Sequence, residues 1–108
     1  MDVGEIAFCG DTAIDVVERE ECVRTARVLL LEVTFLDDRV SIESARKNGH
    51  VHLDELIERA HLFQNEAIVF THFSARYTDR DISRILDARL PETLRSRVIP
   101  AIAESIRV

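Results

Sequence analysis

The chain is poor in several residue types, and each shortage narrows what it can be. Its 108 residues include no tryptophan, one tyrosine, two cysteines, two prolines and three glycines. No low-complexity linker and no internal repeat is present, so the length fits one domain with a modest core. Cys9 and Cys22 lack C-x-x-C spacing and form no zinc-finger pattern with the four histidines, so we interpret them as reduced thiols.

Long apolar runs and an excess of positive charge are missing as well. No segment approaches the roughly 20 apolar residues that span a bilayer, and no signal sequence opens the chain, so we expect a cytoplasmic protein with no membrane partner. The net charge is −6, from 20 acidic and 14 basic residues. This balance excludes a general electrostatic attraction to nucleic acid, so any such contact must be local.

Three short apolar runs are typical of buried strands. They cover residues 5–9, 28–33 and 67–71. Their continuous apolar character predicts a parallel sheet covered on both faces. In a sheet with one solvent-exposed face, apolar and polar residues would alternate along each strand. Helices are predicted over 51–63 and 79–88, the second capped by Thr78 with Asp81 and ended by Pro91.

The remaining segments are less regular. Residues 20–26 have a helical pattern, whereas 14–17 could extend as a short strand. Residues 37–49 are predicted to be a loop with one helical turn near 42–46, and the tail 98–108 a strand followed by a helix. The class is therefore α/β in the order β-α-β-α-β-α, with right-handed crossovers between parallel strands.

Polar motifs follow these strands. Ligands bind at the carboxyl ends of strands in open α/β sheets, so side chains there raise a functional question. The motifs are Gly10-Asp11-Thr12, Glu32-Val33-Thr34-Phe35, Gly49-His50 and His72-Phe73-Ser74. Together they offer two carboxylates and two imidazoles, a set suited to metal binding and acid/base chemistry.

Each motif residue also has a plainer interpretation. Asp11 follows a glycine, where aspartate commonly forms a turn or caps a helix. Glu32 is expensive to bury in an apolar strand unless it is paired, so it is either a structural hydrogen-bond partner or a site residue. His52 and His61 are expected at the surface. The plainer roles are a solvated turn for His50, a strand cap for His72, and loop packing for Arg76 and Tyr77.

Taken in order, four segments carry a family resemblance. They are Phe8-Cys9-Gly10-Asp11-Thr12, Leu31 through Asp38, Ala45 through His50, and Thr71 through Tyr77. The set resembles the C-terminal half of a metallo-β-lactamase-fold nuclease, most closely short-form ribonuclease Z, the tRNA 3′-processing endonuclease. The resemblance implies that residues 1–108 are one αβ half of an αββα sandwich, without the N-terminal half that carries the family's histidine-rich metal motif.

The resemblance also implies a metal site that is only partly present. Asp11 matches the family's aspartate that bridges two metal ions, usually zinc, and His72 matches the last histidine ligand of one of them. Catalytic zinc usually takes three protein ligands and a water, so zinc is expected to bind weakly or not at all to this chain alone. In the intact site, two zinc ions would activate water for attack on phosphorus.

Further roles are implied for four residues. His50 and Glu32 match the pair that orients or protonates the leaving group, since a carboxylate holding an imidazole favours its charged form. Ser74 and Arg76 match a loop element, for which we expect a phosphate-side or loop-shaping role.

Two positions depart from the pattern of many members, which have His before the glutamate and Ser or Thr after Gly-His. This chain has Leu31 and Val51 there. The expected function is that of a partial metal-dependent phosphodiesterase, inactive alone and acting on precursor tRNA in the intact enzyme. Its exposed sheet face should pair with the missing half or self-associate. Two different functions also fit the sequence: hydrolysis of a small phosphodiester or ester, and a non-catalytic α/β interaction module.

Overall fold

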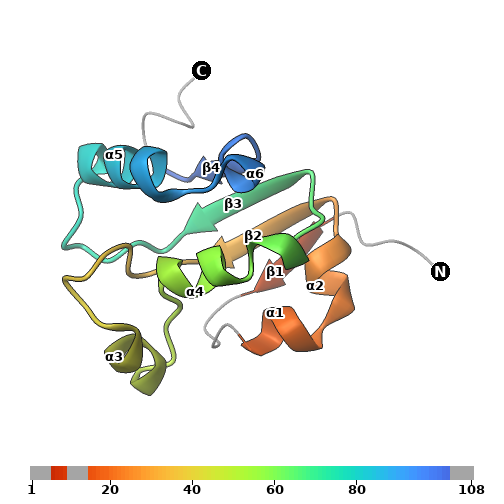
Figure 1. Ribbon diagram of the computed structural model, residues 1–108, viewed down its shortest axis with the longest axis horizontal. Coiled ribbons are helices and arrows are strands. Elements are labelled where there is room, and N and C mark those ends of the chain that lie inside the picture. Colours follow the sequence, from red (N-terminus) through yellow and green to blue (C-terminus); the bar gives the residue numbers. More distant parts are fainter. Residues whose placement is uncertain (1–5, 10–14, 103–108) are drawn as a thin grey trace.

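A computed structural model describes residues 6–9 and 15–102 of the chain. In chain order the elements are β1 (Ile6–Cys9), α1 (Asp15–Arg19), α2 (Glu21–Thr25), β2 (Val28–Glu32), α3 (Ile42–Lys47), α4 (Leu53–Glu58), the 3₁₀ helix η1 (Ala60–Leu62), β3 (Ala67–Thr71), α5 (Asp79–Arg89), α6 (Glu92–Arg95) and β4 (Val98–Pro100). The four strands form one parallel sheet in the order β1-β2-β3-β4. The predicted α/β class is confirmed (Figure 1).

The sheet buries one of its two faces. Leu29 and Leu31 of β2 are buried, as are Ile68 and Phe70 of β3, and each alternates with neighbours of intermediate exposure. The strand register places these buried residues on a common face. In Figure 1, α4 passes in front of the sheet, while α5 and α6 run along its β4 side.

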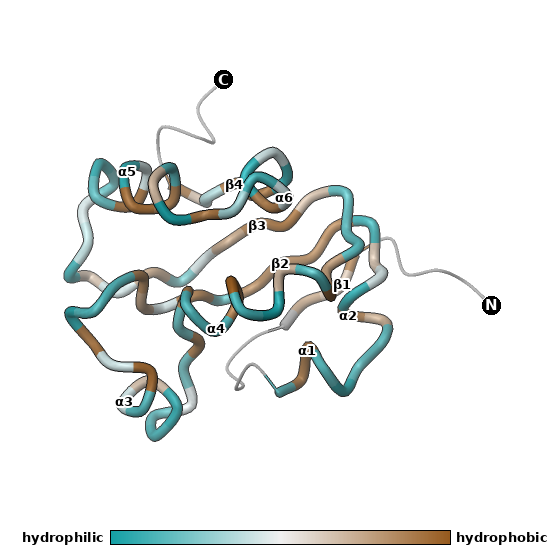
Figure 2. Tube along the Cα trace, in the orientation of Figure 1, coloured by the Kyte–Doolittle hydropathy of each residue, from teal (hydrophilic) through white to brown (hydrophobic). Residues whose placement is uncertain are grey.

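The opposite face is apolar and open. In the strand register, Phe8, Leu30, Val69 and Ile99 form a row across all four strands. Phe8 is 64% exposed and Ile99 44% exposed. The strand pattern predicted cover on both faces, which is wrong for this chain, whereas the exposed sheet face expected from the family resemblance is confirmed. The register puts apolar residues on both faces of the strands, so each run is continuous whether or not the second face is covered. Figure 2 shows the strands as largely hydrophobic along their length.

Helix α5 follows the signals in its sequence. Thr78 accepts a hydrogen bond from the Asp81 N–H, and the Asp81 carboxylate accepts one from the Thr78 N–H, so the predicted capping box is complete. Leu90 is extended before Pro91 and ends the helix, since a residue before proline disfavours helical geometry. The helix buries Ile82, Ile85 and Leu86.

Other elements depart in part from the predictions. The helix predicted over 51–63 stops at Glu58 and continues as η1, and α1 makes residues 15–17 helical, so a strand there is wrong. Helices α2 and α3 and strand β4 confirm the helical pattern at 20–26, the turn near 42–46 and the strand in the tail, whereas α6 was not predicted. The helix expected at the end of the tail falls largely on 103–108, outside the described residues. Among the described residues, none of the helices is long and apolar enough to cross a bilayer.

Candidate functional site at the strand ends

Three polar segments are joined by backbone hydrogen bonds at the carboxyl end of the sheet. Beyond β2, the Val33 N–H donates to the Thr71 carbonyl at 3.0 Å. Thr34 then bonds in two directions. Its carbonyl accepts the Ser74 N–H at 3.0 Å, and its N–H donates to the Val51 carbonyl at 3.1 Å. The segments that carry Glu32, His50 and His72 therefore converge, whereas Asp11 lies outside the described residues.

A helix C-cap places His50. At the end of α3, the His50 N–H donates to the Ala45 carbonyl at 2.9 Å and the Gly49 N–H donates to the Arg46 carbonyl at 3.1 Å. This is the Schellman pattern, which needs a residue in the left-handed region, and Gly49 has φ +75°. The half-buried His50 ring then meets Phe35 edge-on, with 5.7 Å between ring centroids and 81° between planes.

His72 has an unusual backbone conformation. Its φ is +62°, and among the described residues it is the only one other than glycine with a positive φ. A side chain in this region costs free energy that the surrounding structure must offset. The conformation directs the chain out of β3, and the His72 side chain is exposed.

Glu32 ends β2 on the open face of the sheet. It lies opposite Thr71 in the register and has intermediate exposure, so its carboxylate avoids the cost of full burial. Between the described side chains of Glu32 and His50, the structure has neither a hydrogen bond nor an ion pair. His50 contacts Phe35 instead.

The loop after β3 is shaped by Ser74 and Tyr77. The Ser74 hydroxyl accepts the Arg76 N–H at 3.3 Å. The buried Tyr77 hydroxyl accepts the Leu36 N–H at 3.0 Å and donates to the Asp37 carboxylate at 3.0 Å. Burial raises the pKa of Tyr77, and the hydrogen bond to the Asp37 carboxylate raises it further. Packing of the loop by Tyr77 is thus confirmed.

Arg39 forms a charged cluster with Asp37 and Asp81 beside this loop. The sequence did not single out Arg39. Its guanidinium lies 3.4 Å from the Asp37 carboxylate and 3.8 Å from that of Asp81, with its carbon 4.9 Å from the Tyr77 ring centroid. The hydrogen bond from the Thr78 N–H lowers the pKa of Asp81, with smaller contributions from Arg84, the Thr78 side chain and Arg39.

His52 was expected at the surface and is instead 1% exposed. It caps α4, where its Nδ1 accepts the Asp54 N–H at 3.1 Å. Its Nε2 must therefore carry the hydrogen, which it shares between the carbonyls of Asp37 and Val40, each at 2.9 Å. The position before a helix with acidic residues in its first turn was the signal for this role. His61 is exposed, as predicted.

The described residues do not by themselves make a metal site. Among them there is no group of three or more His, Cys, Asp or Glu side chains placed to hold a metal ion. His72 is a single exposed candidate ligand, and catalytic zinc normally needs three. Cys22 is a free, exposed cysteine, in line with the predicted thiol, and belongs to no such group.

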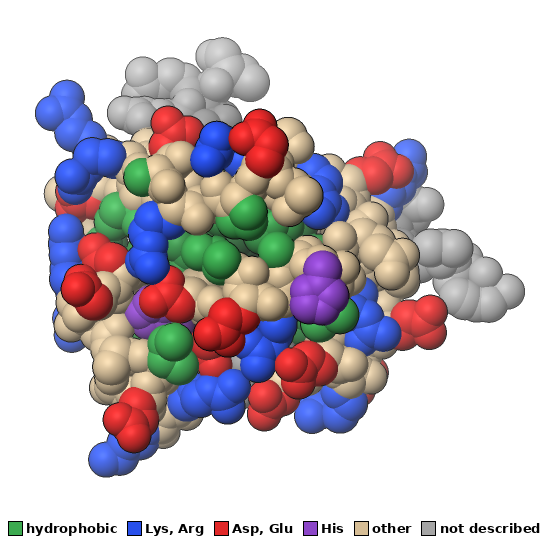
Figure 3. Space-filling view, in the orientation of Figure 1, with side chains coloured by type: hydrophobic (Ala, Val, Ile, Leu, Met, Phe, Trp, Pro, Cys, Tyr) green, Lys and Arg blue, Asp and Glu red, His purple; other side chains and the backbone are tan. Residues whose placement is uncertain are grey.

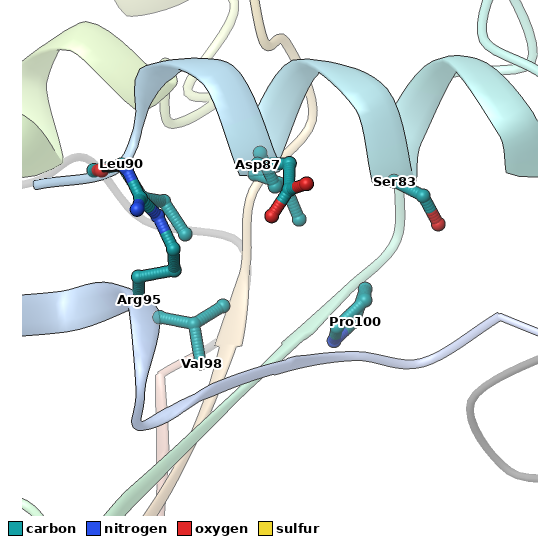
Figure 4. Close-up of a pocket in the computed structure, with 7 residues that line it drawn as sticks. Ser83, Asp87, Leu90, Arg95, Val98 and Pro100 are labelled. Carbon is teal, nitrogen blue, oxygen red and sulfur yellow. Dashed lines mark hydrogen bonds between the residues drawn. The ribbon is translucent and has the colours of Figure 1, made fainter. Parts of the chain in front are cut away.

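A separate pocket of about 280 Å³ lies between α5, α6 and β4 (Figure 4). Its lining residues are Ser83, Leu86, Asp87, Leu90, Arg95, Val98 and Pro100. On the face seen in Figure 3, hydrophobic side chains gather between α5 and α4, with charged side chains around them. None of the predicted site residues lines the pocket, so it is distinct from the strand-end site.

The known proteins that are similar to this chain belong to one family. The tRNase Z TRZ1 of Arabidopsis thaliana is 48% identical over 96 residues, which are 87% of this chain and 34% of that protein. The chloroplastic tRNase Z TRZ2 of the same plant is 37% identical over 98 residues, 89% of this chain and 27% of that protein. The chain belongs with the ribonuclease Z proteins. No family model matches it.

Similar ribonuclease Z proteins also occur outside plants, and the similarity covers only part of their length. The ribonuclease Z of Pyrobaculum aerophilum is 36% identical over 85 residues, 79% of this chain and 29% of that protein. The chain spans about a third of the length of the curated relatives it matches. Ribonuclease Z relatives imply a metallo-β-lactamase fold, and the four-stranded parallel sheet with helices on one face accords with one αβ half of it.

Proposed function

We propose that this chain supplies one half of the active site of a metal-dependent endonuclease that processes the 3′ ends of tRNA precursors. The observation that carries the proposal is the convergence of the segments bearing Glu32, His50 and His72 at the carboxyl end of a parallel sheet. Its relatives named tRNase Z support the substrate. Residues 1–108 would be the C-terminal half of a metallo-β-lactamase-like domain.

In this proposal, Asp11 and His72 are metal ligands, and zinc is the expected metal. Two residues do not complete a zinc site, so the remaining ligands must come from the other half of the domain. That half would also cover the open face of the sheet. The partner is therefore a segment that supplies both an apolar surface and further histidines.

Glu32 and His50 are proposed to act at the leaving group, and Ser74 and Arg76 on the phosphate side. A hydrogen bond from the imidazole to the Glu32 carboxylate would hold the ring in one orientation and favour its charged form. Because Glu32 lies on the open face, covering that face would remove water from its carboxylate and strengthen its attraction to His50. The pair is thus expected to form on assembly.

The test is to combine the chain with the half that carries the histidine-rich motif and to measure zinc-dependent cleavage of precursor tRNA. Asp11→Ala and His72→Ala should each abolish cleavage, whereas His61→Ala, at an exposed position in η1, should leave it unchanged. Treatment with a chelator should remove activity and zinc should restore it. Full activity in either ligand variant would overturn the proposal.

A second candidate is a non-catalytic interaction module, favoured by the open apolar face. It predicts negligible zinc in the purified, combined protein. A third, hydrolysis of a small phosphodiester or ester, predicts that bis(p-nitrophenyl) phosphate is turned over faster than precursor tRNA. A cytoplasmic location is also part of the proposal. One relative is named chloroplastic, so cell fractionation is needed to distinguish the two compartments.

A further inference from the structure

Two arginines beside the loop after β3 have different surroundings. The Arg39 guanidinium lies near the carboxylates of Asp37 and Asp81 and over the Tyr77 ring, so its charge is compensated within the protein. Arg76 is exposed, and within the described part of the chain its guanidinium forms no ion pair. Its guanidinium carbon lies 5.8 Å from the centroid of the Phe35 ring. Arg76 therefore has an open outer side and an uncompensated charge.

Phe35, whose ring lies beside the Arg76 guanidinium, is itself held in place. The Phe35 carbonyl accepts the Leu53 N–H at 2.8 Å, and its N–H points to the Val51 carbonyl at 3.4 Å. The ring also meets the His50 ring edge-on, with 5.7 Å between centroids. The ring is thus held by backbone bonds and by an aromatic neighbour, and it links the proposed leaving-group histidine to the arginine.

We propose that Arg76, backed by Phe35, is a stacking platform for one unpaired nucleobase of an RNA substrate, in a base–guanidinium–phenyl stack. The proposal rests on the proposed function and adds a base contact to it. A guanidinium is planar, delocalised and weakly hydrated, so it stacks on rings with both of its faces. Unpaired bases in RNA stack on aromatic rings and on arginine planes. Because the protein as a whole is acidic, the contact depends on this local group.

The chemistry separates a base platform from a phosphate contact. A lysine at position 76 would keep the positive charge but lose the plane, so it would preserve attraction to phosphate and abolish stacking. A leucine at position 35 would remove the aromatic backing while keeping an apolar side chain. Phe35→Tyr retains the ring and should behave like the parent.

The experiment compares two small probes, adenosine 5′-monophosphate and ribose 5-phosphate, which share sugar and phosphate and differ by the base. Binding to the metal-free protein is followed by NMR, using the resonances of Arg76, Phe35 and His50. The parent and Phe35→Tyr should bind the nucleotide at least about fivefold more tightly than the sugar phosphate. Arg76→Lys and Phe35→Leu should bring this ratio close to one. The matched control Arg80→Lys, an exposed arginine of α5, should leave it unchanged.

Equal binding of the two probes by the parent, or no binding of either, would overturn the platform. So would an unchanged ratio in Arg76→Lys, which would reduce Arg76 to a phosphate contact. Arg76 is exposed, so its lysine variant should fold and give a clear answer. The measurement needs no metal and no cleavage. Its failure leaves the endonuclease proposal standing, and a base preference without tRNA cleavage would overturn only the endonuclease.

Discussion

The hydroxyl of Tyr77 accepts the backbone N–H of Leu36 at 3.0 Å and so joins the loop after β3 to the loop after β2. The two residues are 41 positions apart in the sequence. Since both lie in the interior, this N–H depends on the tyrosine for its hydrogen bond.

Tyr77→Phe should therefore lower the free energy of unfolding by about 1–3 kcal/mol, because it leaves the buried Leu36 N–H without an acceptor. Asp37→Asn keeps that acceptor and should cost less. Urea denaturation at pH 7 measures both. An equal or smaller loss in Tyr77→Phe would show that the Leu36 bond contributes little.

The raised pKa of Tyr77 gives the same variant a signature in alkali. A folded-state pKa above the ordinary value of about 10 favours the protonated fold, so this contribution is complete below pH 10. It is lost as the pH rises from 10 through the folded-state pKa. Tyr77→Phe should lose less stability than the parent over that range, and identical slopes would contradict the assignment.

The positive φ of His72 predicts an inversion of the usual preference between glycine and alanine. At position 72, the glycine variant should be more stable than the alanine variant by about 1 kcal/mol, because glycine adopts the left-handed region without strain. At His61, in η1, alanine should be the more stable by a similar amount. Thermal unfolding of the four variants checks this, and the same order at both positions would refute it.

Gly49 should matter for its backbone alone. A Cβ atom there would meet no heavy atom within 4 Å, yet φ is +75°. Gly49→Ala should cost about 1 kcal/mol, whereas Gly49→Asn should cost less, since asparagine tolerates this conformation. Both are measured by chemical denaturation. In the alanine variant, the NMR signals of His50 should also shift, because the cap positions that residue. Equal costs for the two variants would rule out a backbone cause.

The open sheet face predicts self-association of the isolated chain. Phe8 and Ile99 are exposed on that face, and among the described residues β1 and β4 have no further strand paired at their outer edges. The purified chain should sediment at a multiple of its 12.3 kDa mass. Phe8→Lys combined with Ile99→Lys should shift it toward monomer, and Thr93→Lys, at an exposed site of α6, should not. A compact monomeric parent would contradict this view of the face.

The helices and strands that could be predicted are those that depend on residues close together in the sequence. The apolar runs of β2 and β3 and the capping box of α5 depend on near neighbours in the chain, so sequence alone located them. The break between α4 and η1, and the helical form of residues 15–17, did not follow, because short segments take the structure that their packing favours.

For the candidate site, the sequence determined which residue types follow each strand and, through the order of the motifs, the resemblance to ribonuclease Z. Only the tertiary structure decided that His52 is buried and that His50 contacts Phe35 rather than Glu32. These facts depend on contacts between residues far apart in the chain. Such contacts are set by how strands align and which surfaces are covered, and local patterns in the sequence do not encode them.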